Sequence, residues 1–218
     1  MLPAWVTELK SLSPAYAPQL VTAAVVAGVI WLLVPDQRLA AAAFLAQRAI
    51  VLILPWPETS DSHAAVGVVA WFAITIIFTG STWSATARHA GHTGHSTPLR
   101  SFRLNALSRA VVASLGVLLA RWCVQTYPSY LPPPLVAFTA IWLIIQGMLA
   151  LLLAGSGLGV GLGALTFADG CRTFYGLAQP NLWMWAVWSI GDILVAWAAA
   201  HLLYAEAVAV PLQSQEPP

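Results

Sequence analysis

The chain contains very few charged residues. Asp, Glu, Lys and Arg together make up 8% of its 218 residues, whereas soluble domains contain about 25%. Hydrophobic residues make up 59% of the chain, and its mean hydropathy is +0.77. This composition excludes an ordinary soluble domain and indicates a membrane protein. The formal net charge of +1 gives no basic surface, so we expect no nucleic-acid partner.

Cysteine is also scarce, and sequence motifs for cofactors or catalysis are lacking. Cys123 and Cys171 both lie in apolar stretches without the spacing of a metal site or a disulfide framework, so we expect two free thiols. The glycine-rich stretch AGSGLGVGLG does not fit the dinucleotide fingerprint. Ser156 lies between glycines, as in intramembrane serine proteases, but the residues after it do not match and His201 is the one candidate base. We therefore expect no enzyme activity and no cofactor.

Long apolar runs predict a transmembrane bundle. A membrane-spanning helix needs about 20 mostly apolar residues. Such stretches cover approximately residues 20–34, 39–54, 64–83, 104–124, 135–154, 157–177 and 182–205. The fourth stretch contains Arg109 and Arg121 and can alternatively lie at the membrane interface, so six spans are the alternative to seven. The predicted fold class is all-α, a polytopic transmembrane helix bundle.

The order of these stretches suggests two three-helix units within one transmembrane domain. A linking helix between the units would give both the same orientation, as in membrane proteins built from repeats. The predicted boundaries are 20–83 for the first unit, 84–102 for a polar loop, 103–126 for the linking helix, 132–206 for the second unit and 207–218 for a polar tail.

The basic residues of the loops predict the orientation in the membrane. With seven spans, Arg38, Arg88, Arg100 and Arg103 fall on one side, which the positive-inside rule assigns to the cytoplasm. We therefore expect the N-terminus outside and the C-terminus inside a prokaryotic inner membrane. Tryptophans near the predicted borders would form an aromatic belt; they are Trp56, Trp83, Trp122, Trp183 and Trp185. Gly157/Gly161 and Gly159/Gly163 have the small-xxx-small spacing of closely packed helices.

Four of the charged residues inside the apolar stretches form the candidate site: Arg48, Asp169, Arg172 and Asp192. An ionisable residue at bilayer depth is costly and needs a partner. Asp169 and Arg172 are three residues apart and share one helix face. The first three spans contain no acid for Arg48, so we expect it to pair with Asp169, Asp192 or a partner chain. The four residues can form a proton or ion relay, or a buried structural ion pair.

The histidines of RHAGHTGH are weak candidates for a metal site. His89, His92 and His95 are spaced by three, and His-rich tracts can bind metal. Glycines separate them, however, and no acid or cysteine lies beside them. A solvated cytoplasmic loop that docks a peripheral subunit is the favoured interpretation, and we expect no bound metal.

The stretch GLGALTFADGCRTFYGL resembles the small K-type membrane subunit of respiratory complex I. It is also similar to the C subunit of multi-subunit sodium/proton antiporters and to the E-type membrane subunit of group 4 hydrogenases. Asp169 lies where the family motif GLELMxNAxNL has its glutamate, and Asp192 corresponds to a further acid in the third helix. The resemblance covers residues 135–206, with a fainter similarity over 20–83. The motif's asparagine is missing, Arg172 is added, and Arg48 stands where the first unit would have an acid.

This resemblance implies a small subunit that lines a proton path beside larger antiporter-like subunits. We therefore expect a non-catalytic membrane subunit of an energy-transducing complex, respiratory or proton/ion-translocating, with other membrane subunits and lipid as partners. Two alternatives remain open. One is a structural subunit of a redox or photosynthetic membrane assembly, and the other is a stand-alone small ion transporter.

Overall fold

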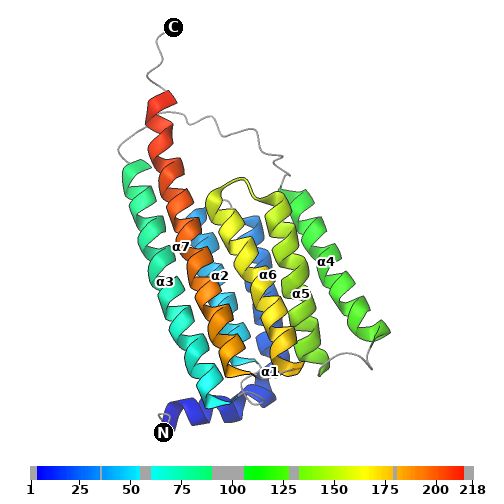
Figure 1. Ribbon diagram of the computed structural model, residues 1–218. Coiled ribbons are helices and arrows are strands. Elements are labelled where there is room, and N and C mark those ends of the chain that lie inside the picture. The colour runs from blue at the N-terminus through cyan, green and yellow to red at the C-terminus, as the bar shows by residue number, and fades with distance from the viewer. Residues whose placement is uncertain are drawn as a thin grey trace.

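The computed structural model describes residues 4–34, 36–54, 60–89, 106–127, 133–178 and 181–213. These residues form seven α-helices and no β-strand, which confirms the predicted all-α fold. The helices pack as a membrane-embedded bundle, and the first helix begins at the opposite end of the bundle from the one where the last helix ends (Figure 1). Their bounds are Ala4–Leu33 (α1), Gln37–Ile53 (α2), Asp61–His89 (α3), Ala106–Thr126 (α4), Pro134–Leu153 (α5), Gly157–Ala178 (α6) and Leu182–Gln213 (α7).

Five of the seven helices are long and apolar enough to cross a membrane by themselves, and they are α1, α3, α4, α5 and α7. Helix α4 belongs to this group, which favours a spanning role over an interfacial one. Helix α2 has only 17 residues, and α6 contains Asp169, Arg172 and several glycines. These two helices lie between others in the bundle, so much of their surface faces protein and not lipid.

Local sequence explains where several helices begin. The Asp36 carboxylate accepts hydrogen bonds from the backbone N–H groups of Arg38 (2.8 Å) and Leu39 (3.4 Å), which caps α2 after a tight turn. Pro134 occupies the first turn of α5, where its missing N–H has no cost. Helix α1 contains Pro14 and Pro18, and its first part runs across the end of the bundle before the chain turns along it (Figure 1).

The helices of the first predicted unit pack against their counterparts in the second. Helix α1 contacts α5, α2 contacts α6, and α3 contacts α7, while α4 contacts α1 and α5 at the edge of the bundle. Along the chain, α2 contacts α1 and α3, and α6 contacts α5 and α7. This arrangement places α2, α6 and α7 together. The origin of the two units as a repeat stays a prediction.

Small residues allow the helices of the second unit to approach closely. A Cβ atom on Gly147 of α5 would overlap the backbone of Phe167 in α6, and one on Gly161 would overlap Ala199 of α7. Gly163 faces the backbone of α5 at 3.0 Å from such a Cβ atom. The expected close packing is therefore present at Gly161 and Gly163, and also at Gly157, where a Cβ atom would lie 2.5 Å from Leu202 Cβ of α7. It is absent at Gly159, where the nearest atoms belong to the turn just before it in the chain.

The predicted aromatic belt is confirmed only in part. Trp83, Trp122 and Trp183 are exposed on the outside of the bundle, as expected for residues that meet lipid or the membrane interface. Trp185 is only 6% exposed, so its assignment to the belt was wrong: it lies on the inward face of α7. Trp56 lies outside the described residues.

Candidate functional site: a buried cluster of four charges

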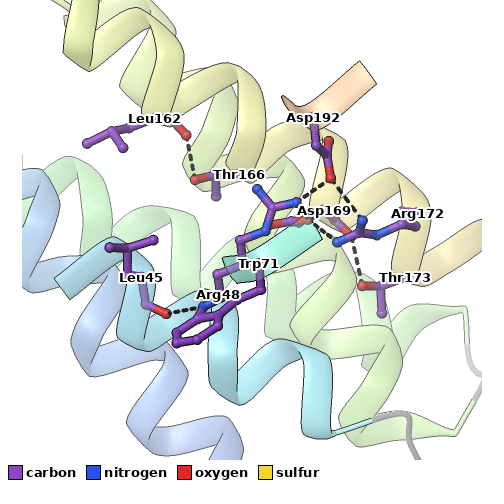
Figure 2. A network of polar contacts seen from close by, with 9 residues as sticks. All are labelled: Leu45, Arg48, Trp71, Leu162, Thr166, Asp169, Arg172, Thr173 and Asp192. Atoms are coloured by element: carbon purple, nitrogen blue, oxygen red, sulfur yellow. Dashed lines mark hydrogen bonds and ion pairs between the residues drawn. The ribbon is translucent and has the colours of Figure 1, made fainter. Parts of the chain in front are cut away.

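The structure brings all four intramembrane charges together at the contact of three helices. Arg48 comes from α2, Asp169 and Arg172 come from α6, and Asp192 comes from α7 (Figure 2). All four residues are buried, with exposed fractions between 3% and 8%. Because the two arginines balance the two aspartates, the cluster has no net formal charge.

Arginine and aspartate side chains alternate around a closed ring. Arg48 contacts both carboxylates, through its ion pair with Asp192 and through a 3.2 Å contact between Nη2 and Asp169 Oδ1. Arg172 likewise contacts both, through its ion pair with Asp169 and through a 2.8 Å hydrogen bond from Nη1 to Asp192 Oδ2. The contacts end on one oxygen of each carboxylate, Asp169 Oδ1 and Asp192 Oδ2.

Arg48 therefore finds its partners within this chain. The sequence left Asp169, Asp192 or a partner chain as possible partners, and the structure shows contacts with both acids. Asp169 and Arg172 also pair across one turn of α6, as their spacing predicted. Whether the cluster relays protons or ions stays a prediction.

Neighbouring polar groups fix the helices around the ring. The Thr173 hydroxyl donates to the backbone carbonyl of Asp169 at 2.7 Å, so it satisfies its own helix and does not compete for the arginines. The Trp71 indole N–H donates to the Leu45 carbonyl at 3.1 Å, which fastens α3 to α2 one turn from Arg48 (Figure 2). The Arg172 guanidinium lies 5.5 Å from the centroid of the Trp185 ring, within the range of a cation–π interaction.

Sequence reasoning missed a second buried polar group, which begins at the chain neighbour of Arg48. The Gln47 amide precedes Arg48 in α2 and donates to Gln146 Oε1 of α5 at 2.6 Å, while Gln146 Nε2 donates back at 3.3 Å. The Trp31 indole N–H donates to Gln47 Oε1 at 2.7 Å. A Cβ atom on Gly28 would lie 2.6 Å from the Gln146 amide, so glycine makes room for the pair. The signal in the sequence that could have revealed this pair is the presence of two glutamines inside apolar stretches.

The other residues singled out by sequence have different environments. His201 stacks on Trp197, with ring centroids 6.0 Å apart, on the exposed side of α7. Ser156 Oγ accepts a hydrogen bond from the Gly159 N–H at 3.2 Å at the beginning of α6. Glu206 Oε1 accepts one from the Gly157 N–H at 2.7 Å, so it ties α7 to the same helix end.

The predictions for cysteine and histidine have different outcomes. Cys123 and Cys171 are both free thiols, as expected. The side chain of His89 and the residues His92 and His95 lie outside the described part of the chain, so the weak metal assignment stays a prediction. Among the residues that the structure describes, no group of three or more His, Cys, Asp and Glu residues could hold a metal ion.

Comparisons with protein-family models, curated proteins and solved structures find no match. The assignment of a function to this membrane-embedded bundle therefore depends on the geometry of its buried charges.

Proposed function

We propose that the protein is a non-catalytic membrane subunit of a proton- or ion-translocating complex, and that its charge cluster takes part in the transfer. The observation that supports this proposal is the burial of Arg48, Asp169, Arg172 and Asp192 in one ring at the contact of α2, α6 and α7. Charges at such depth are costly, and they commonly mark proton or ion pathways.

The ring geometry is suited to exchanging a proton. Both arginines contact both acids, so a proton that binds Asp169 leaves Arg48 and Arg172 attached to Asp192. The same holds in reverse when the proton binds Asp192. The cluster can therefore change the site of protonation without leaving either guanidinium group unpaired, which would be strongly unfavourable in a buried environment.

The resemblance of α6 to the small K-type subunit supports the role as part of a complex. It places Asp169 at the acid of the family motif, and it implies larger antiporter-like neighbours. The outer faces of α4 and α7 expose large apolar side chains, among them Leu118, Val187 and Leu194, which suit lipid and membrane subunits alike. In this proposal the end of the bundle at Arg38 faces the cytoplasm of a prokaryotic cell, and the N-terminus lies outside.

A structural role is the second candidate, and the closed pairing of the ring favours it. Two arginines and two aspartates that satisfy one another can lock three helices together without any transfer. The substitution Asp169→Asn and the charge-balanced double substitution Asp169→Asn/Arg172→Gln separate the two functions. If the ring only holds helices, the balanced variant regains assembly and activity together. If the ring transfers protons, the balanced variant assembles but remains inactive.

The experiment that tests the proposal begins with the native membrane. Mild-detergent extraction, size separation and mass spectrometry should show this chain migrating with larger antiporter-like or redox subunits. The complex is then reconstituted into vesicles that contain a pH-sensitive dye, and proton movement under an imposed gradient is compared for the wild type and Asp169→Asn. Arg121→Gln is the matched control, because Arg121 is exposed on α4. Migration of the chain alone, or equal proton movement in Asp169→Asn, would contradict the proposal.

A further inference from the structure

A stripe of buried residues on α7 leads from the beginning of that helix to the charge cluster. Trp185, Ser189 and Asp192 are separated by four and three residues, so they lie on one helix face, and all three are buried. At a rise of 1.5 Å per residue, the stripe spans about 10 Å along the helix. It therefore reaches from near the end of the bundle to the depth of the ring.

His63 of α3 lies beside the outer end of this stripe. Helices α3 and α7 begin at the same end of the bundle and pack against each other (Figure 1). His63 is 7% exposed as a residue, and its ring packs edge-on against Trp185, with centroids 5.5 Å apart. Its Nδ1 atom shares a hydrogen bond with Ser60 Oγ, and Ser60 is exposed. The imidazole thus has one nitrogen directed to the surface and the remainder of its ring inside.

Trp185 connects the surroundings of His63 with those of the ring. Its indole ring packs against the His63 ring, and the Arg172 guanidinium lies 5.5 Å from the centroid of the same indole. A Cβ atom on Gly176 of α6 would lie 2.9 Å from Trp185 Cζ2, so glycine provides the space for the indole. Arg172 in turn contacts Asp169 and Asp192. The charge that faces His63 across the indole is therefore that of Arg172.

Three buried polar atoms in this region have no hydrogen-bond partner within the described part of the chain. They are His63 Nε2, Ser189 Oγ and Arg48 Nη1. Buried polar atoms are almost always paired with protein or with ordered water, and polar interior sites of this kind bind internal water molecules. His63 Nε2 lies at the outer end of the stripe, Ser189 Oγ lies within it, and Arg48 Nη1 lies at the ring.

We propose that His63 exchanges protons between the aqueous phase at this end of the bundle and the charge cluster, along a route that includes Ser189. The inference rests on the proposed transfer function of the ring. An imidazole accepts a proton on one nitrogen and releases one from the other, so no other bond is made or broken. The proton passes from the side of Ser60 to Nε2 and onward to Asp192, with the Ser189 hydroxyl as an intermediate donor and acceptor.

The test uses the extracted complex with its partner subunits, reconstituted in vesicles that contain a pH-sensitive dye. His63→Gln retains a hydrogen-bonding group for Ser60 but cannot exchange a proton. We expect it to slow proton movement by about 100-fold, in line with the contribution of a positioned proton-transfer side chain. The matched control is His201→Gln, which changes an exposed histidine of α7 and should move protons at the wild-type rate.

A structural contribution of His63 is separated by chemical rescue. His63→Ala leaves space beside Trp185, and added imidazole should restore a large part of the proton movement if the lost group is a proton carrier. Ser189→Ala, which removes only a hydroxyl, should slow movement while the complex remains assembled by size separation. Slow movement in His63→Ala without rescue, together with loss of assembly, would overturn the inference.

The failures of the two proposals are distinguishable. If the charge-balanced variant Asp169→Asn/Arg172→Gln assembles but moves no protons, whereas His63→Gln and Ser189→Ala retain the wild-type rate, the ring transfers protons by another route and this inference is overturned. If Asp169→Asn retains the wild-type rate as well, or if the wild-type vesicles move no protons, the proposed function itself fails and the inference fails with it.

Discussion

Removal of Arg48 is the most direct perturbation of the charge cluster. Its guanidinium contacts both Asp169 and Asp192 and is 4% exposed. Replacement by methionine, a side chain of similar length, leaves Arg172 alone with two carboxylates, so the buried site acquires a formal charge of −1. Breaking a buried pair costs about 3–5 kcal/mol, and about 1 kcal/mol corresponds to 2–4 °C in Tm for chains of this size. We therefore expect Arg48→Met to unfold about 6–20 °C below the wild type.

The assay is thermal unfolding in one mild detergent, followed by circular dichroism. Arg121→Met is the control because this arginine is exposed on α4, and its Tm should remain near that of the wild type. The double variant Arg48→Met/Asp192→Asn leaves Asp169 and Arg172 as a one-to-one pair, so it should recover part of the loss. Residues in contact show coupling energies of about 0.5–3 kcal/mol. A Tm of Arg48→Met equal to that of the control, or strictly additive losses in the double variant, would refute the reasoning.

Three further substitutions test the packing around the site by the same Tm measurement. Gly147→Ala should destabilise the bundle by about 1–3 kcal/mol, because its Cβ atom would meet the backbone of α6, whereas Gly191→Ala, with open space around it, should not; equal effects would contradict this. Gln47→Leu leaves the Gln146 amide without its partner and should cost about 1–3 kcal/mol, with Gln47→Leu/Gln146→Leu closer to the wild type; a double variant worse than the single one would exclude a balanced amide pair. Glu206→Ala removes the carboxylate at the N-terminus of α6 and should cost about 1 kcal/mol, which an unchanged Tm would disprove.

The apolar runs predicted which segments are helical better than where each helix ends. The second stretch was expected at 39–54 and is Gln37–Ile53, and the sixth was expected at 157–177 and is Gly157–Ala178. The third helix, expected to end at 83, continues to His89. Apolar residues report the part of a helix that lipid or protein covers, whereas polar residues beyond it can continue the same backbone hydrogen bonds.

The sequence was sufficient to predict which residues form the candidate site, but not which of them contact one another across helices. Asp169 and Arg172 pair within one helix, so their spacing was sufficient. The contact of Arg48 with Asp192 joins residues 144 positions apart, and it depends on how α2 packs against α6 and α7. The cost of a buried charge indicated that Arg48 needs a partner, but this cost does not specify which one. Gln47 and Gln146 gave a weaker signal because an uncharged amide is less costly to bury.

The buried charges also explain why two helices that could not cross a membrane by themselves belong to this bundle. Helix α2 and helix α6 contain three of the four charges, and both fall short of a helix that could cross a membrane by itself. Arg48 of α2 is neutralised by Asp169 of α6 and Asp192 of α7, and Arg172 of α6 contacts Asp192 of α7 in addition to Asp169 of its own helix. Their stable placement therefore depends on forming the ring, so the contacts that the proposed proton relay would use are also the contacts that hold these helices together. A single neutralisation disturbs both, and only a charge-balanced pair of substitutions can separate transfer from assembly.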